Sequence, residues 1–273
     1  MFTGFFRSKL TYFLLVLYLF FVGWWAEINI RHLQSDPQNY YYGFAYALVA
    51  VLGGLNGLNI AKSWGGFKSI VGRGISFFSL GLLSLAFGQI VFSYYNIIAK
   101  VEVPFPSLAD LGYFSIIIFY ILGSLSLFKV AGSKFSLHTL KGRLSVIIIP
   151  VLALAASYFL FIRDLQFDFS GVSNSIATFL SFSTPFGDAI YLSIVLLTFQ
   201  LSRKFLGGVM RSRILLLIFA LAFEYFTEYL FLYQAAAGTY YNGGIDDLLF
   251  ATSITIMALG LNSLRLKKRH EEQ

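Results

Sequence analysis

The stretch Leu10–Ile30, LTYFLLVLYLFFVGWWAEINI, holds about 20 predominantly apolar residues in a row. A helix needs roughly 20 such residues to cross the hydrocarbon core of a bilayer, whereas the apolar region of a secretory signal peptide spans only about 7–15 residues. No small-residue cleavage site follows this stretch. We therefore interpret it as a membrane-spanning helix that is retained in the mature protein.

Apolar runs of similar length recur along the whole chain, with short polar breaks between them. Of the 273 residues, 58% are hydrophobic and 12% are charged, and the mean hydropathy is +0.74. Soluble domains contain about 45–50% apolar and about 25% charged residues, so the composition excludes a soluble enzyme with one anchor, a disordered chain and a nucleic-acid-binding module. We predict an all-α polytopic membrane bundle forming a single domain over 1–265, with a short tail at 266–273. The predicted helices are 9–30, 41–62, 73–99, 107–130, 143–163, 185–203, 212–237 and 244–265.

The net charge of +7 is distributed unevenly between the predicted loops. If the helices alternate in direction, 17 of the 20 Lys and Arg residues fall on one side, and only Arg31, Lys100 and Arg163 fall on the other. Cytoplasmic loops carry an excess of Lys and Arg, so this asymmetry places both termini in the cytoplasm. We expect a multi-pass protein of the bacterial cytoplasmic membrane, surrounded by the lipid bilayer and without a nucleic-acid partner.

Eleven of the 13 carboxylates fall in the predicted outer loops, in the outer halves of helices or near mid-membrane. Glu224 lies about 18 Å from the cytoplasmic start of its predicted helix, and the spacing of four residues places Glu228 on the same helix face. Ionisable side chains at this depth are costly and typically mark a functional site, and two neighbouring carboxylates can share a proton. The alternative is a structural hydrogen-bond network with Gln89, nearby tyrosines or Thr227.

Two predicted hairpins resemble each other. The run LAFGQ at 85–89 matches LAFE at 221–224, and each is followed by an aromatic-rich helix end, a short outer loop and a helix that opens with an acid. We infer a module built from related helical hairpins, with the first two helices as a more divergent pair. An aspartate followed three residues later by an aromatic residue occurs at Asp110/Tyr113, Asp188/Tyr191 and Asp247/Phe250.

Two interpretations of these aspartates remain open. In the first, they cap helix N-termini: Ser107 and Asp110 match a capping box, Asp246 fits a first helical turn, and Asp188 fits less well because it lies one position deeper. In the second, the acids converge with their aromatic partners on one extracytoplasmic pocket. Tyrosines near the outer acids would then line a pocket for a cationic or apolar ligand; they are Tyr94, Tyr95, Tyr113, Tyr191, Tyr225 and Tyr229.

Three segments carry a resemblance to a known class of protein: VPFPSLADLGYF (103–114), TPFGDAIYLSIVLL (184–197) and GTYYNGGIDDLLFATSITIMALGLNSL (238–264). They resemble the eight-helix membrane sensor regions that precede bacterial diguanylate cyclases, phosphodiesterases and histidine kinases. The resemblance covers roughly 73–265, and Pro-Ser-x-Ala-Asp-x-x-Tyr is its most specific part. It implies a sensory role with a separate cytoplasmic or membrane signalling partner, because no output domain follows the last predicted helix. Members of that class tend to carry an acid on the third helix, where this chain has Gln89.

The leading functional hypothesis is therefore a ligand-sensing module without catalysis of its own, which takes a small ligand from the outer side. The candidate ligand-binding residues are Glu224, Glu228, Asp110, Asp188, Asp247, Gln89, Tyr113 and Tyr191. The alternative is a proton- or cation-coupled transporter that uses the mid-membrane carboxylates. An intramembrane enzyme has less support, because the chain has no cysteine and its three histidines are scattered outside the predicted helix interiors. We predict no catalytic residue, no metal site and no cofactor.

Three further features of the sequence predict local structure. Glu27 and Arg31, four residues apart, predict a salt bridge at the outer end of the first helix. The longest outer loop contains Asp164 and Asp168, and we expect its stretch 170–184 to be solvated chain. Glycines at 53, 54 and 57 permit close helix packing, either within the molecule or at a dimer face.

Overall fold

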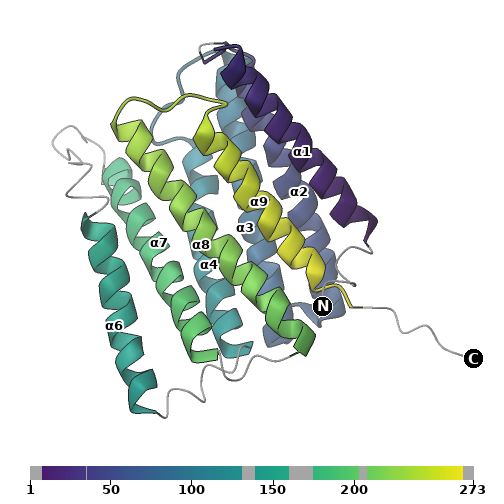
Figure 1. Ribbon diagram of the computed structural model, residues 1–273. Coiled ribbons are helices and arrows are strands. Elements are labelled where there is room, and N and C mark those ends of the chain that lie inside the picture. The colour runs from purple at the N-terminus through teal and green to yellow at the C-terminus, as the bar shows by residue number, and fades with distance from the viewer. Residues whose placement is uncertain (1–7, 35, 131–138, 160–174, 203–207, 267–273) are drawn as a thin grey trace, which may run out of the picture.

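The computed structural model describes residues 8–34, 36–130, 139–159, 175–202 and 208–266. Within these ranges the chain forms eight α-helices in one bundle, and helices that follow one another in the chain run antiparallel (Figure 1). The all-α prediction is confirmed. The helices are α1 (Lys9–Ile30), α2 (Asn39–Ser63), α3 (Ile70–Ser93), α4 (Leu108–Val130), α6 (Leu140–Ser157), α7 (Ser175–Ser202), α8 (Gly208–Ala236) and α9 (Ile245–Ser263).

Six helices in the described part of the chain are long and apolar enough to cross a membrane: α1, α2, α3 with its extension to Ala99, α4, α8 and α9. The extension, Tyr94–Ala99, is π-helical and continues α3 without a break. The protein is thus a multi-pass integral membrane protein, as its composition predicts. α6 is shorter and contains Pro150 in its interior.

One helix boundary was predicted wrongly. α7 begins at Ser175, ten residues before the predicted start at 185, so Pro185 lies inside the helix. A proline removes one backbone donor, but membrane helices tolerate it where neighbouring helices satisfy the freed carbonyl. The part of the predicted solvated loop that falls at 175–184 is therefore helical, whereas 170–174, Asp164 and Asp168 lie outside the described residues.

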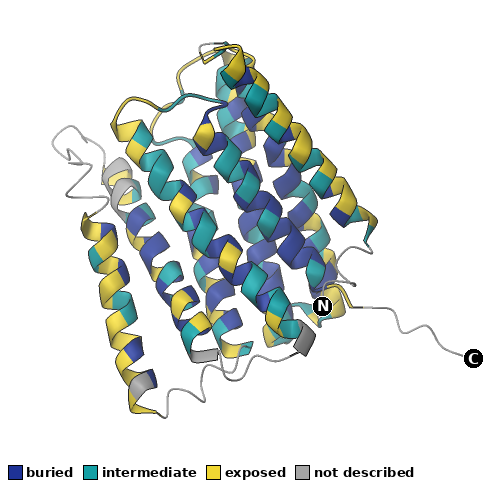
Figure 2. Cartoon of the chain, in the orientation of Figure 1, coloured by how far each residue is buried: buried dark blue, intermediate teal, exposed yellow. Residues whose placement is uncertain are grey.

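Six helices form a closed ring in the order α2, α3, α4, α7, α8, α9, with α9 packing back against α2. α1 lies outside this ring against α9 and α2, and α6 lies outside it against α7. Figure 2 shows the same division, because buried residues concentrate on the ring helices while α1 and α6 are largely exposed. In a bilayer those exposed apolar faces contact lipid.

The two ends of the bundle differ in charge. α1 begins and α9 ends at one end, which we call the basic end (Figure 1). The Lys and Arg residues in or next to the helix termini at the basic end are Lys9, Lys62, Lys68, Arg73, Lys129, Lys141, Arg143, Arg211, Arg213 and Arg265. At the other end, called here the cavity end, the described basic residues are Arg31 and Lys100. Arg31 forms the predicted salt bridge with Glu27, at 3.2 Å.

Glycines set the closest helix contacts inside the ring. Gly53, Gly54 and Gly57 are buried, and a Cβ atom on Gly53 would lie 2.6 Å from Cβ of Ala258 on α9. The glycine stripe of α2 therefore packs within the molecule, against α3 and α9. Gly88 and Gly112 meet where α3 crosses α4, and a Cβ on Gly112 would lie 2.5 Å from the backbone nitrogen of Gly88.

Candidate functional site

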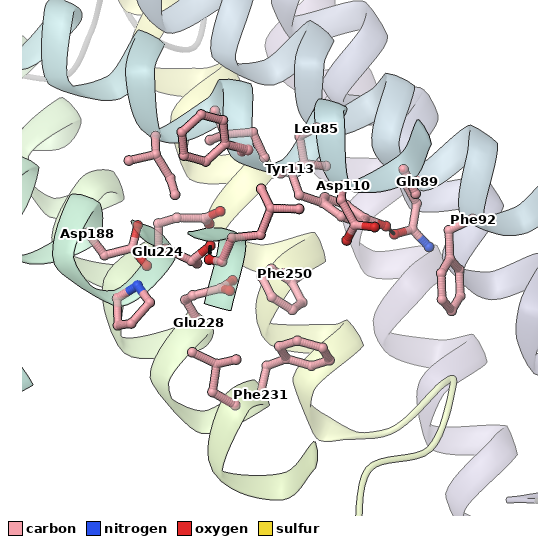
Figure 3. Close-up of a pocket in the computed structure, with 18 of the residues that line it drawn as sticks. Leu85, Gln89, Phe92, Asp110, Tyr113, Asp188, Glu224, Glu228, Phe231 and Phe250 are labelled. Carbon is pink, nitrogen blue, oxygen red and sulfur yellow. Dashed lines mark hydrogen bonds between the residues drawn. The ribbon is translucent and has the colours of Figure 1, made fainter. Parts of the chain in front are cut away.

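A cavity of about 570 Å³ lies inside the ring, in the half of the bundle nearer the cavity end (Figure 3). Every ring helix contributes to its wall, together with loop residues Val103, Pro104, Phe105 and Tyr240. All eight residues predicted as candidates line it: Gln89, Asp110, Tyr113, Asp188, Tyr191, Glu224, Glu228 and Asp247. The structure thus brings together on one cavity residues that are up to 158 positions apart in the chain, from Gln89 to Asp247.

Three carboxyl groups form a cluster on α7 and α8, which we call the acid triad: Asp188, Glu224 and Glu228. Figure 3 shows their side chains pointing toward one another in the cavity. Asp188 is 4% exposed and Glu224 is 7% exposed, and the Oδ2 atom of Asp188 has no hydrogen-bond partner. Asp188 lies about 20 Å along α7 from its first residue at 1.5 Å per residue, so the capping interpretation of Asp188 is wrong.

Asp110 both caps a helix and lines the cavity, which are the two roles that the sequence left open. The backbone N–H of Ser107 donates to Oδ2 of Asp110 at 2.6 Å, the Ser107 hydroxyl donates to the same oxygen at 3.0 Å, and the N–H of Ala109 donates to Oγ of Ser107 at 3.1 Å. This confirms the predicted capping box at the start of α4. The same carboxylate also lines the cavity, but its Oδ2 is already engaged by Ser107.

Asp247 holds the loop before α9 in place. Its Oδ2 accepts the backbone N–H of Gly243 at 2.6 Å, and its Oδ1 accepts the hydroxyls of Tyr46 at 3.4 Å and Tyr240 at 3.5 Å. Burial, and next to it the nearby Asp247 carboxylate, raise the pKa of Tyr240 well above its ordinary value. Tyr240 therefore stays protonated and keeps its hydrogen available for donation to Asp247.

The capping role predicted for Asp246 is performed by its neighbour. Asp246 is 1% exposed, and both of its carboxylate oxygens lack a hydrogen-bond partner. Its position in the first turn of α9 still places it near the positive end of the helix dipole. The hydrogen bond that closes the turn goes to Asp247 because Gly243, with φ +79°, directs its N–H toward that side chain.

Gln89 is fixed between two helices by the close α3–α4 crossing. The Tyr113 hydroxyl donates to Oε1 of Gln89 at 2.8 Å, and the Nε2 atom of Gln89 lies against Gly43 on α2, where a Cβ would approach it to 2.6 Å. A Cβ on Gly88 would lie 2.9 Å from the Tyr113 ring. The glycines thus bring α3 close enough to α4 for the Gln89–Tyr113 hydrogen bond to form.

The cavity is closed toward the basic end. The rings of Tyr120 and Tyr191 meet edge to face with centroids 6.0 Å apart, and both side chains are almost fully buried. Closer to the basic end the ring interior is filled by buried apolar side chains such as Phe78, Leu217 and Met257. A separate void of about 20 Å³ near the basic end is lined by apolar residues together with Gly74 and Ser126. No acidic residue is part of its described lining.

Sequence reasoning placed some tyrosines wrongly and missed others. Tyr94, Tyr95, Tyr225 and Tyr229 do not belong to the described lining, and the Tyr225 hydroxyl instead hydrogen-bonds the Ser157 hydroxyl on α6 at 2.8 Å. Tyr46, Tyr120 and Tyr240 were missed. Tyr240 carried a usable signal, because it precedes the glycine pair and the two aspartates in 240–247, whereas nothing in the sequence distinguishes Tyr46 or Tyr120 from other apolar-face tyrosines.

The charged side chains in the described cavity lining are all acidic. Among the described residues that line the cavity, five carry a carboxyl group and none is Lys, Arg or His. No group of three or more His, Asp or Glu side chains in the described ranges is placed to hold a metal ion. Chemically, the arrangement can hold protons or accept hydrogen bonds from a cationic group, and its aromatic wall can bind an apolar body.

Comparisons of the chain with protein-family models, with curated proteins and with solved structures gave no match.

Proposed function

We propose that the protein is a membrane sensory module that binds a small ligand from the extracytoplasmic side in the acidic and aromatic cavity, without catalysis of its own. The observation that carries the proposal is the convergence of all eight candidate residues on one cavity of about 570 Å³. Ligand pockets for small molecules have volumes of about 300–1,000 Å³ and combine mostly apolar walls with a few polar groups.

Two further observations support this function. The basic residues gather at the end opposite the cavity, so the positive-inside rule directs the basic end to the cytoplasm and the cavity outward. Both chain ends are then cytoplasmic, in a bacterial inner membrane. The resemblance of 103–114, 184–197 and 238–264 to bacterial sensor regions favours the same role, with a separate cytoplasmic or membrane protein as the signalling partner.

α9 is the element best placed to transmit binding to the basic end. It contributes Asp247 and Phe250 to the cavity, and its other end is held by hydrogen bonds to two helices. Nδ2 of Asn262 donates to Oγ1 of Thr11 at 2.8 Å, and Nδ2 of Asn56 donates to Oδ1 of Asn262 at 3.2 Å. A ligand that shifts α9 changes these contacts with α1 and α2, where a cytoplasmic partner can detect the change.

Binding in the cavity can be tested with a matched pair of variants on α4. Ile116 lines the cavity and is half-buried, whereas Ile118 is 45% exposed on the face away from it. Purified protein in nanodiscs would be screened against a small-molecule set by thermal unfolding. We expect at least one compound to raise the Tm of the natural protein and of Ile118→Trp but not of Ile116→Trp, because only the tryptophan at 116 fills the cavity.

Two results of the screen would contradict this proposal. A compound that stabilises all three proteins equally binds outside the cavity, and a screen without any stabilising compound speaks against a ligand-binding role. A ligand present at 100 times its Kd stabilises by about 2.7 kcal/mol, which such a screen detects readily. Recovery of a chemically altered compound would contradict the absence of catalysis.

The two glutamates on one face of α8, Glu224 and Glu228, favour one alternative, a proton- or cation-coupled transporter. Such a protein would have to open the packed region around Tyr120 and Tyr191 to the basic end. Protein reconstituted in liposomes would be tested for uptake of any compound that the screen identifies. Flux that is abolished in Glu224→Gln would establish transport, whereas binding without flux is the result expected for a sensor.

A further inference from the structure

The residues that line the cavity indicate which class of ligand it binds. This inference rests on the proposed role of the cavity as a sensory site. We propose that it binds an amphipathic organic cation, with a single ammonium-type head at the acid triad of Asp188, Glu224 and Glu228 and an apolar body directed toward the mouth.

Three of the five carboxyl groups already have internal partners, and one of them is Glu224, which accepts a hydrogen bond from the Ser253 hydroxyl. Oδ2 of Asp110 accepts two hydrogen bonds from Ser107, and Asp247 accepts hydrogen bonds from Gly243, Tyr46 and Tyr240. Asp188 differs, because its Oδ2 is buried in a side chain that is 4% exposed and accepts no hydrogen bond. Buried acceptors in proteins nearly always have a partner. Asp188 is thus the position where the cavity lacks a donor.

An ammonium group supplies what the acid triad lacks. It carries positive charge, donates three hydrogen bonds and accepts none, so it can satisfy Asp188 and its neighbours together. A bare metal ion fits less well, because no group of acids or histidines among the described residues has the arrangement of a metal site. A neutral hydroxyl would offer a single hydrogen and leave the carboxylates without a counter-charge.

The wall between the acid triad and the cavity end is mostly apolar, with Thr184 one turn before Asp188. On α7, Leu180 lies eight residues before Asp188, and on α8, Leu232 lies eight residues after Glu224. At 1.5 Å per residue, Leu180 is therefore about 12 Å nearer the cavity end than Asp188, and Leu232 is about 12 Å nearer it than Glu224 and about 6 Å nearer it than Glu228. Phe231 and Phe250 lie on the same wall, and their rings pack edge to face at 5.9 Å. The ligand consequently enters with its cationic head first.

The mouth is formed by the loop that precedes α4. Phe105 lines the cavity and is also 57% exposed, so its ring lies at the boundary between the cavity and the surroundings. An apolar body that extends about 12 Å from the cationic head reaches the level of Leu180 and Leu232. The depth of the acid triad, the mostly apolar wall above it and the negative charge of the acids therefore define one ligand shape. It is a compact cation on an elongated aromatic or aliphatic body.

Three probes of equal skeleton test the inference: 4-phenylbutylammonium, 4-phenylbutan-1-ol and 4-phenylbutyrate. Their Kd values would be measured by titration calorimetry on the full chain in phosphatidylcholine nanodiscs, with empty nanodiscs subtracted. We expect the ammonium to bind at least about tenfold more tightly than the alcohol, since one charge-assisted hydrogen bond accounts for that ratio, and the carboxylate to bind more weakly than the alcohol.

Variants locate the cationic head. Asp188→Asn and Glu228→Gln should each weaken ammonium binding by about tenfold or more and change alcohol binding by less than about twofold. Glu27→Gln removes an acid at the same end of the bundle, outside the described cavity lining, and should change neither Kd. Thermal unfolding of each variant without probe verifies that it is folded, and the two triad variants serve as independent tests.

Each outcome is decisive. If the alcohol binds as tightly as the ammonium, the cation inference is wrong, but an outward-facing ligand cavity stands. A preference for the ammonium that survives both triad variants, or that is lost in Glu27→Gln, places the cation elsewhere and also overturns the inference. If none of the three probes binds, the result counts against both this inference and the proposed ligand-binding function.

Discussion

At the residue scale, Gly243 links the shape of a loop to the geometry of the cavity. Its φ of +79° lies in the left-handed region that disfavours other residues, and a Cβ atom there would lie 2.9 Å from Cδ1 of Ile28. Its N–H donates to Asp247, which also accepts hydrogen bonds from Tyr46 and Tyr240. The backbone conformation at Gly243 therefore helps to hold Asp247 in place, and Asp247 in turn contacts two tyrosines of the cavity wall.

We predict that Gly243→Ala destabilises the protein more than Gly238→Ala. Both glycines have positive φ, so each substitution should cost about 1–2 kcal/mol in backbone strain. Gly238 has no atom within 4 Å of the position of a Cβ, whereas Gly243 has Ile28 and Asn39 there. Thermal unfolding in detergent measures the difference. Equal losses in the two variants would show that the contact with Ile28 relaxes freely.

Residues with local roles and acids within apolar helices could be predicted from sequence, whereas tyrosines such as Tyr46, whose position at the cavity depends on packing, could not. The Ser107–Asp110 capping box depends on four consecutive residues, and its hydrogen bonds are present. Tyr46 is 3% exposed at the cavity while Phe44, two residues away, is 39% exposed. In water, polarity would separate the two faces of such a helix, but lipid is as apolar as the bundle interior, so composition does not reveal which face turns inward.

At the scale of elements, the crossing of α3 and α4 depends on two glycines. We predict that Gly112→Ala destabilises the protein by about 1–3 kcal/mol, because a Cβ would overlap the backbone of Gly88 and force the helices apart. Gly23→Ala on α1 is the matched control, with no atom within 4 Å of the position of a Cβ. It should be neutral or stabilise by about 0.5–1 kcal/mol, because alanine favours the helix. Destabilisation by Gly23→Ala of the same size would contradict this account.

The helix α9 is fixed to its neighbours by polar contacts at the basic end. We predict that Asn262→Ala lowers stability by about 0.6–1.7 kcal/mol for each interhelical hydrogen bond lost, to Thr11 and from Asn56. In the control Asn96→Ala the lost bond is local, from Nδ2 to the carbonyl of Phe92 in the preceding turn. A smaller change is expected there. Similar Tm losses in both variants would remove the evidence that α9 is held by these contacts.

The presence of each helix was easier to predict than the residue at which it begins. Seven of the eight α-helices in the described ranges begin within four residues of their predicted starts, because each is a long apolar run bounded by charged or small residues. The start of α7 was misplaced because Pro185 resembles a first-turn proline, and the ten residues before it are rich in Ser and Thr. The convergence of the acids on one cavity needed the ring order of the helices, which hydropathy does not contain.

At the scale of the whole molecule, the orientation in the membrane can be measured directly because the chain contains no cysteine. Thr239 is exposed at the cavity end and Ser63 is exposed at the basic end. In intact cells, a membrane-impermeant maleimide should label Thr239→Cys and leave Ser63→Cys unlabelled, and permeabilisation should make Ser63→Cys reactive. Labelling of Ser63→Cys in intact cells would reverse the proposed orientation.

The cavity is closed toward the basic end by Tyr120 and Tyr191, and this closure has a consequence for the surrounding bilayer. The half of the bundle nearer the basic end contains a void of only about 20 Å³, whereas the half nearer the cavity end contains the cavity of about 570 Å³, so the second half has more room to contract. A contraction around the cavity would therefore reduce the cross-sectional area of the protein in one leaflet only. The lateral pressure of that leaflet then enters the energy difference between the open and contracted shapes, and lipids that alter curvature stress would shift their populations.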